Sequence, residues 1–165
     1  MNAPNGNLAV DWTLLAEINA FNSAYGHTID DDALERWPDF FTEDCFYQII
    51  ARENVDAGLP GAIIYCDSRG MLVDRIVALR RANIYPEHYS RHVIGTAMIT
   101  GVDGDAIGAQ ASYVVLQTRA DGETKIYNAG RYRDRFVRVD GALRLARREC
   151  IYDTHSIATL LVTPI

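Results

Sequence analysis

The first thirty residues carry apolar side chains at the spacing of an amphipathic helix. The apolar positions are Leu14, Ile18, Phe21 and Tyr25. Their intervals of four, three and four residues place them on one face of a helix. Asp11 precedes them as a suitable N-cap, and Gly26 follows as a C-terminal stop. The pattern therefore predicts a first helix that begins after Asp11, ends at Gly26 and buries its apolar face.

Two more helices are indicated further along the chain. The run Asp30 to Asp32 can cap a short second helix, which Pro38 must end because proline cannot continue a helix. Ser68 can cap a third helix, in which Arg80 and Arg81 stand at the end favoured by the helix dipole. The inward side chains of this helix are predicted to be Leu72, Ile76 and Leu79.

Strands dominate the second half of the sequence. Asp-Gly pairs at 103–104, 121–122 and 140–141 separate alternating or apolar runs, and such pairs are a strong hairpin signal. They predict strands at about 91–101, 106–119, 124–138 and 143–155. Two shorter strands are predicted at 45–51 and 61–66, on either side of a loop at 54–61. Helices followed by a long meander indicate an α+β fold, with a curved antiparallel sheet packed on three helices.

Length and composition indicate one globular domain spanning residues 1–165, with 1–10 as a flexible N-terminal segment. The content of 48% apolar and 23% charged residues is that of an ordinary soluble protein. No run approaches the roughly 20 apolar residues of a membrane span, and no secretory signal is visible. We therefore expect a cytoplasmic protein that does not contact membranes. The three widely spaced cysteines, Cys45, Cys66 and Cys150, are expected to be small buried side chains.

Charge is distributed unevenly along the chain. Residues 1–60 contain eleven acidic and two basic side chains, whereas residues 131–148 contain seven arginines and two acids. The net charge of −6 and the pI near 5.1 argue against nucleic-acid binding. Fifteen of the sixteen basic residues are arginines, which pair well with carboxylates at interfaces. The pattern therefore favours a subunit interface or a solvated sheet face.

The segment from Gly130 to Arg138 alternates with a period of two. One face carries Tyr132, Asp134 and Phe136, and the other carries Arg131, Arg133 and Arg135. The next strand adds Arg144 and Arg148 on one face and Arg147 on the other. A sheet face with this much charge is expected to meet water or a partner.

Motifs for common catalytic sites are absent from the sequence. We find no Gly-rich phosphate loop, no GxSxG elbow and no CxxC. The spacing of His88 and His92 is that of helical zinc motifs, and Pro86 and the strand that follows argue against a helix there. A metal site in this chain is therefore not expected. An acid–base site in a cone-shaped cavity between helices and sheet remains an alternative, and its candidate residues are His27, Asp31, Asp32 and His92.

Three segments resemble one known family. They are "DRIVALRRANIYPEHYSRHVIGTAMI" (74–99), "YRDRFVRVDGALRLARRECIYDT" (132–154) and "INAFNSAYGHTIDDDALERWPDFFTEDCFYQI" (18–49). The first resembles the region of an Arg/Leu-rich helix, a loop and an Arg-His pair entering a strand in the β (small) subunits of aromatic-ring-hydroxylating dioxygenases. The second is similar to the family's final hairpin, and the third to its N-terminal part. Terephthalate-, salicylate- and benzoate-type subunits are the most similar branch.

The resemblance implies a cystatin-like α+β roll, shared with nuclear transport factor 2, ketosteroid isomerase and scytalone dehydratase. It implies a non-catalytic structural subunit of a bacterial enzyme of aromatic catabolism, without a cofactor in this chain. The partner α subunit would carry the Rieske 2Fe–2S cluster and the mononuclear Fe(II), and the assembly would be α3β3 around a trimer of β chains. The alternatives are a free-standing lyase or isomerase of the same fold and a binding adaptor.

Interface residues are predicted from charge and from the resemblance together. The candidates are Arg80, Arg81, Arg91, His92, Arg131, Arg133 and Arg135. Their arginines are expected to meet acidic patches on the α subunit or on a neighbouring β subunit. Arg91 and His92 are expected to act as hydrogen-bonding groups that fix the strand or its contacts with a neighbouring subunit.

Overall fold

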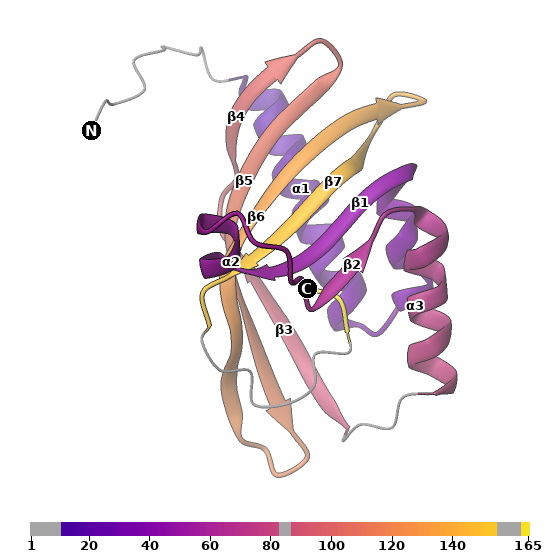
Figure 1. The fold of residues 1–165 in the computed structure, drawn as a ribbon, viewed down its shortest axis with the longest axis vertical. Coiled ribbons are helices and arrows are strands. Elements are labelled where there is room, and N and C mark those ends of the chain that lie inside the picture. Colours follow the sequence, from indigo (N-terminus) through magenta and orange to yellow (C-terminus); the bar gives the residue numbers. More distant parts are fainter. Residues whose placement is uncertain (1–10, 83–86, 155–162) are drawn as a thin grey trace, which may run out of the picture.

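The computed structural model describes residues 11–82, 87–154 and 163–165, and the predicted flexible segment 1–10 lies outside them. A seven-stranded sheet and the helices form the layers seen in Figure 1. The helices are α1 (Trp12–Asp30), η1 (Leu34–Phe40, a 3-10 helix), α2 (Arg52–Asp56) and α3 (Arg69–Arg81). The strands are β1 (Phe41–Ala51), β2 (Ile64–Cys66), β3 (His88–Ile94), β4 (Met98–Asp103), β5 (Ala106–Arg119), β6 (Thr124–Val139) and β7 (Ala142–Tyr152).

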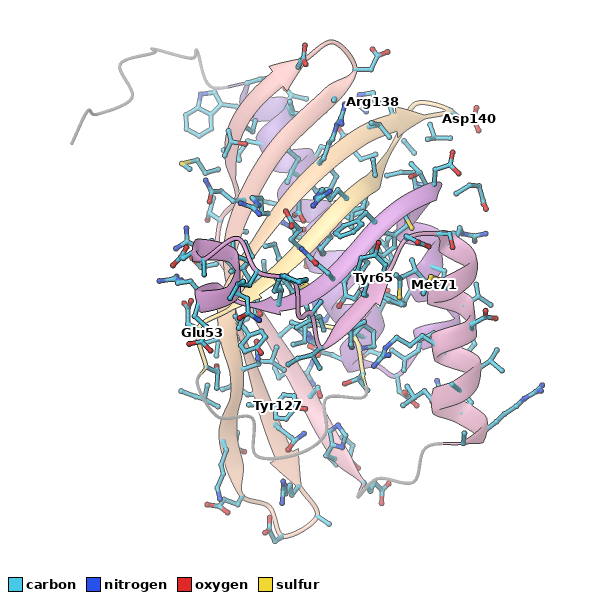
Figure 2. The ribbon with its side chains drawn as sticks, in the orientation of Figure 1. Glu53, Tyr65, Met71, Tyr127, Arg138 and Asp140 are labelled. Carbon is cyan, nitrogen blue, oxygen red and sulfur yellow. The ribbon has the colours of Figure 1, made fainter. Side chains whose placement is uncertain are left out.

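The sheet order is β2-β1-β7-β6-β5-β3, with β4 also pairing with β5. The three predicted Asp-Gly hairpins are confirmed, because β4–β5, β5–β6 and β6–β7 are antiparallel pairs. Arg138 and Asp140 lie at the last of these turns (Figure 2), where Asp140 and Gly141 have φ of 52° and 80°. The sheet is mixed rather than wholly antiparallel, since β1 pairs in parallel with β7. A parallel pair needs a long crossover connection, which the chain between β1 and β7 supplies.

Helix α1 crosses the sheet and contacts β3 (Figure 1). Asp11 caps it as predicted, because its side chain accepts a hydrogen bond from Leu14 N. The predicted stop at Gly26 is wrong, since the helix continues to Asp30. A Cβ on Gly26 would lie 3.3 Å from His92 Cβ and 3.2 Å from Ile94 Cδ1. Gly26 is therefore a contact point between α1 and β3, and its small size serves packing rather than chain reversal.

The turn after α1 also differs from the prediction. Helix η1 begins after Ala33, and no side chain caps it, so the run Asp30 to Asp32 has other partners. Asp32 has a φ of 54°, which reverses the chain between the two helices. The predicted stop at Pro38 is wrong, since η1 continues to Phe40 and Pro38 lies buried inside it. Helix α2 occupies part of the segment that the sequence indicates as a loop.

Helix α3 follows the prediction closely. Ser68 accepts a hydrogen bond from Met71 N, and the buried side chains are Leu72, Ile76 and Leu79. The single strand predicted at 91–101 is instead split into β3 and β4, which pair with different parts of β5. The break is fixed by two hydrogen bonds, from Gly95 N to Ser112 O (2.8 Å) and from Ala97 N to Asn19 Oδ1 (2.9 Å).

The space between helices and sheet is filled mostly by aromatic side chains. Tyr25 meets the rings of Phe40, Phe41 and Tyr132 edge-on, at centroid distances of 5.4, 6.3 and 6.2 Å. Ile165 joins this core at 1% exposure, and its carbonyl accepts hydrogen bonds from Tyr25 Oη (2.9 Å) and Tyr47 Oη (3.2 Å). The expected burial of the three cysteines is confirmed. In the described part of the chain, no helix has the length and apolarity of a membrane span.

Candidate functional site

The arginine strand β6 presents its arginines on the outer face of the sheet. Arg131, Arg133 and Arg135 are exposed, whereas Tyr132, Asp134 and Phe136 are buried against the helices. The alternation predicted from the sequence is therefore confirmed. This outer face is the surface on which a charged partner could bind.

Glu149 of β7 links side chains of three neighbouring strands on this face. Its carboxylate accepts hydrogen bonds from Arg133 Nε (2.8 Å), Arg147 Nη2 (3.1 Å) and Gln48 Nε2 (2.6 Å). Arg147 also lies 4.1 Å above the ring of Phe46. Burial raises the pKa of Glu149, but the hydrogen bonds and charges of Arg147 and Arg133 outweigh it, and the pKa falls to about 2. Arg133 and Arg147 thus share the single negative charge of Glu149.

Glu149→Gln should remove the part of the free energy of unfolding that the wild type loses as the pH falls. A carboxyl group whose folded pKa lies below its unfolded value stabilises the fold above the unfolded pKa of about 4.3. The contribution is lost as the pH falls towards the folded pKa of about 2. Both arginines are about half exposed, so we expect roughly 1–2 kcal/mol after solvent screening. Urea unfolding gives the free energy of unfolding at pH 6 and at pH 3. The difference between these two values should be smaller for Glu149→Gln than for wild type. Equal differences would contradict the pairing of Glu149 with Arg133 and Arg147.

The other predicted interface arginines have different surroundings. Arg80 is bound within the chain, to Asp32 (2.7 Å) and Glu35 (2.7 Å). Arg91 lies 3.7 Å from Asp30, and its side chain is 59% exposed. No ion pair within the described residues involves Arg81, Arg131 or Arg135, and all three are exposed.

Arg148 does not lie on a charged sheet face. Its side chain has 0% exposure and donates from Nε and Nη2 to Asp134 (2.9 and 2.7 Å) and from Nη2 to Asn22 (2.6 Å). The guanidinium lies between the rings of Tyr25 and Tyr132, 4.2 and 4.1 Å from their centroids. A register shift in the β6–β7 pairing moves Arg148 to the buried face opposite Asp134. The sequence contained one signal for this pair, because Asp134 alternates with two aromatic core residues and a buried carboxylate requires a partner.

The four acid–base candidates do not form one site, because His27 and His92 line a groove between α1 and β3 whereas Asp31 and Asp32 do not. His27, Asp31 and Asp32 are exposed, and Asp32 is paired with Arg80. His92 is instead bound by Asp30, which the sequence pattern presented only as a cap. Asp30 Oδ1 lies 2.6 Å from His92 Nδ1, and the same carboxylate accepts a hydrogen bond from the His92 backbone N–H (2.8 Å). This pair ties the C-terminal end of α1 to β3.

The chain offers little for metal or thiol chemistry. Within the described residues, no three His, Cys, Asp or Glu side chains gather as metal ligands, so a Rieske cluster or a mononuclear iron finds no matching ligand set there. Burial raises the pKa of Cys45 to about 11 and that of Cys150 to about 12. These thiols stay protonated at neutral pH and are poor nucleophiles.

The sequence and the fold match known proteins along nearly the whole chain. Residues 12–149 match the SnoaL-like domain. The chain is 47% identical over 160 residues to the anthranilate 1,2-dioxygenase small subunit of Burkholderia cepacia, covering 96% of this chain and 99% of that one. It is 44% identical to terephthalate 1,2-dioxygenase terminal oxygenase component subunit beta 2 of a Comamonas species, covering 90% of this chain and 97% of that one.

A solved structure agrees with these relatives. It is described as the β subunit of an aromatic-ring-hydroxylating dioxygenase from Novosphingobium aromaticivorans, and it is 62% identical with a TM-score of 0.86. The match covers 93% of this chain and 97% of that chain. The present chain therefore belongs to the family of small (β) subunits of aromatic-ring-hydroxylating dioxygenases.

Proposed function

We propose that this chain is the non-catalytic structural subunit of a terminal oxygenase in the bacterial cytoplasm. Its partner would be a large α subunit that carries the Rieske 2Fe–2S cluster and the mononuclear Fe(II), in an α3β3 assembly built on a β trimer. The observation that carries the proposal is similarity to dioxygenase small subunits along nearly the whole chain. The aromatic interior and the absence of a metal-ligand cluster among the described residues are consistent with a structural role.

The substrate class can be proposed from the relatives. Two of them are named for anthranilate and terephthalate, which are both aromatic carboxylates. We therefore expect the complete oxygenase to hydroxylate an aromatic carboxylate as part of aromatic catabolism. The residues that select the substrate are expected to belong to the α subunit.

The interface would use arginines that have no acidic partner among the described residues. Arg131 and Arg135 meet this condition, and they flank Arg133, which pairs with Glu149, on the same strand. A second contact region would contain Arg81 and the exposed Arg91, which has a long 3.7 Å contact with Asp30. His92 is buried against Asp30 and would fix the strand that carries Arg91. One exposed ion pair is worth about 0–1 kcal/mol, so assembly would depend on several arginines together.

Co-expression with the large subunit tests this function. We expect the two chains to co-purify in equal amounts with the mass of an α3β3 complex, and iron to be present in the complex. The double variant Arg131→Glu/Arg135→Glu should weaken assembly about tenfold or more in dilution experiments followed by light scattering. Arg36→Glu, which changes an exposed arginine on η1, is the matched control and should leave assembly unchanged.

Two results would contradict these proposals. A stable monomer that ignores the co-expressed large subunit would rule out the subunit role. Unchanged assembly of the double variant would show that Arg131 and Arg135 are simply solvated, and the subunit role would then rest on another surface.

A further inference from the structure

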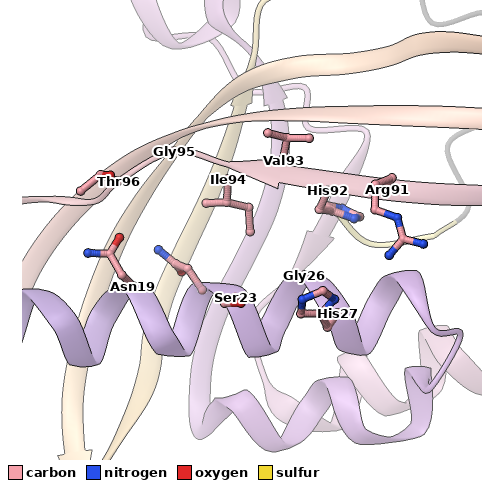
Figure 3. A pocket seen from close by; sticks show the side chains of 11 residues that line it. Asn19, Ser23, Gly26, His27, Arg91, His92, Val93, Ile94, Gly95 and Thr96 are labelled. Atoms are coloured by element: carbon pink, nitrogen blue, oxygen red, sulfur yellow. The ribbon is translucent and has the colours of Figure 1, made fainter.

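A groove of about 470 Å³ lies between α1 and β3. Figure 3 shows Ser23, Gly26 and His27 on the helix facing Arg91, His92 and Ile94 on the strand. Arg91 is exposed and bends towards the helix, where it comes within 3.7 Å of Asp30. The volume is within the range of sites that hold a small organic molecule.

Two buried polar side chains that line this groove have an atom without a partner. The His92 side chain is 1% exposed, and Asp30 engages its Nδ1, which leaves Nε2 without a hydrogen bond among the described residues. Asn22 is 2% exposed, and its Oδ1 accepts from Arg148, which leaves Nδ2 without a partner there. Leaving such groups unpaired costs about 1–3 kcal/mol each, so a ligand that satisfies both is favoured.

The chemistry of these atoms limits the ligand. Because the Asp30 carboxylate accepts from Nδ1, the Nε2 atom of neutral His92 is an acceptor, and protonation would make it a donor. The amide nitrogen of Asn22 can only donate, and so can the Arg91 guanidinium at the rim. A carboxyl group suits these groups in either protonation state, since its oxygens can accept from Asn22 and Arg91 and can share a proton with Nε2.

We propose that the groove between α1 and β3 binds a small organic carboxylate through Asn22, His92 and Arg91. The carboxylate lies against Asn22 and His92, and the apolar part of the ligand lies along Ile94, which also lines the groove. All of its lining residues belong to this chain, and Arg91 also lies in the proposed second contact region, so benzoate binding is measured on the free chain without the large subunit. Its failure and the failure of the subunit role can therefore be told apart.

Titration of the full chain with benzoate, followed by NMR of ¹⁵N-labelled histidine, tests the site. We expect a saturable shift of the His92 Nε2 signal, with a dissociation constant on the order of 1 mM or below. His88, on the same strand but outside the groove lining, should not shift. Benzyl alcohol, which keeps the ring and lacks the carboxylate, should bind at least tenfold more weakly. An unsaturable response to benzoate, or an equal response to benzyl alcohol, would overturn the proposal and indicate that ordered water satisfies Asn22 and His92.

A surface variant provides a second measurement that does not risk the fold. Arg91→Gln should weaken benzoate binding about tenfold, because it removes a charge-assisted contact at an exposed position. Arg36 lies on η1 and does not line the groove, so Arg36→Gln should bind benzoate as the wild type does. Equal affinity of the Arg91→Gln and Arg36→Gln variants would exclude Arg91 from the site and contradict the proposal as stated.

Discussion

Arg148→Met should lower the free energy of unfolding by about 3–5 kcal/mol. The variant keeps the length and apolar stem of the side chain but leaves the Asp134 carboxylate, 1% exposed, without its counter-charge. It also removes the guanidinium from between Tyr25 and Tyr132 and leaves Asn22 Oδ1 without its donor. Denaturant unfolding followed by the fluorescence of buried Trp37 would measure the loss.

The pH dependence of this loss gives an independent check. Burial already raises the pKa of Asp134, and the Arg148 charge opposes that rise. Without Arg148 the folded pKa rises further above the unfolded value of about 3.9. A carboxyl group with a raised folded pKa loses stability as the pH increases, so the deficit should be larger at pH 8 than at pH 5.

Two controls separate the lost ion pair from a general effect of losing an arginine. Arg131→Met, at an exposed position on the neighbouring strand, should change stability by less than about 0.5 kcal/mol. The double variant Asp134→Leu/Arg148→Met should recover more than half of the loss, because it removes both buried charges together. A loss of less than 1 kcal/mol in the single variant would mean that Arg148 is not buried as described.

Gly130→Ala should destabilise the protein by on the order of 3 kcal/mol. A Cβ at this position would clash with Ile151 O and would lie 2.7 Å from Tyr152 Cα, which are backbone atoms of the neighbouring strand. These atoms cannot move without separating β6 from β7, where Gly130 pairs with Tyr152. Thermal and denaturant unfolding would both report the change.

The same chain offers a graded series of glycine controls. Gly101→Ala meets no atom within 4 Å and should be within about 0.5 kcal/mol of wild type. Gly108→Ala would place its Cβ 2.7 Å from Thr100 Oγ1, a side-chain atom that can rotate away, so an intermediate loss is expected. Equal effects at all three positions would be inconsistent with the close approach of β6 and β7.

Much of the fold was predictable because its signals are local. The Ser68 cap, the apolar spacing of α3 and the three Asp-Gly turns each depend on a few neighbouring residues. The alternation of Arg131, Arg133 and Arg135 with buried partners is equally local, because side chains on a strand alternate between two faces. The family resemblance also needed only the order of residues along the chain.

The errors arose where distant segments meet. Gly26 is a helix stop by local rules, but it is required because α1 packs against His92 and Ile94 of β3. Asp30 is a capping residue by local rules, but in the fold it binds His92, 62 positions away. The pair that forms around His92 therefore includes Asp30, an aspartate outside the set of acid–base candidates.

The sequence by itself determined the class of fold, the hairpin turns, the charged face of β6 and the family. Only the tertiary structure decided the partner of each charge. It placed Arg148 against Asp134 inside the core and Arg133 against Glu149 on the outer face, although both arginines look alike in the sequence. The physical reason is that a pairing register, and the single-residue shift within it, are fixed by packing over the whole sheet, so no local pattern specifies which face a charge meets.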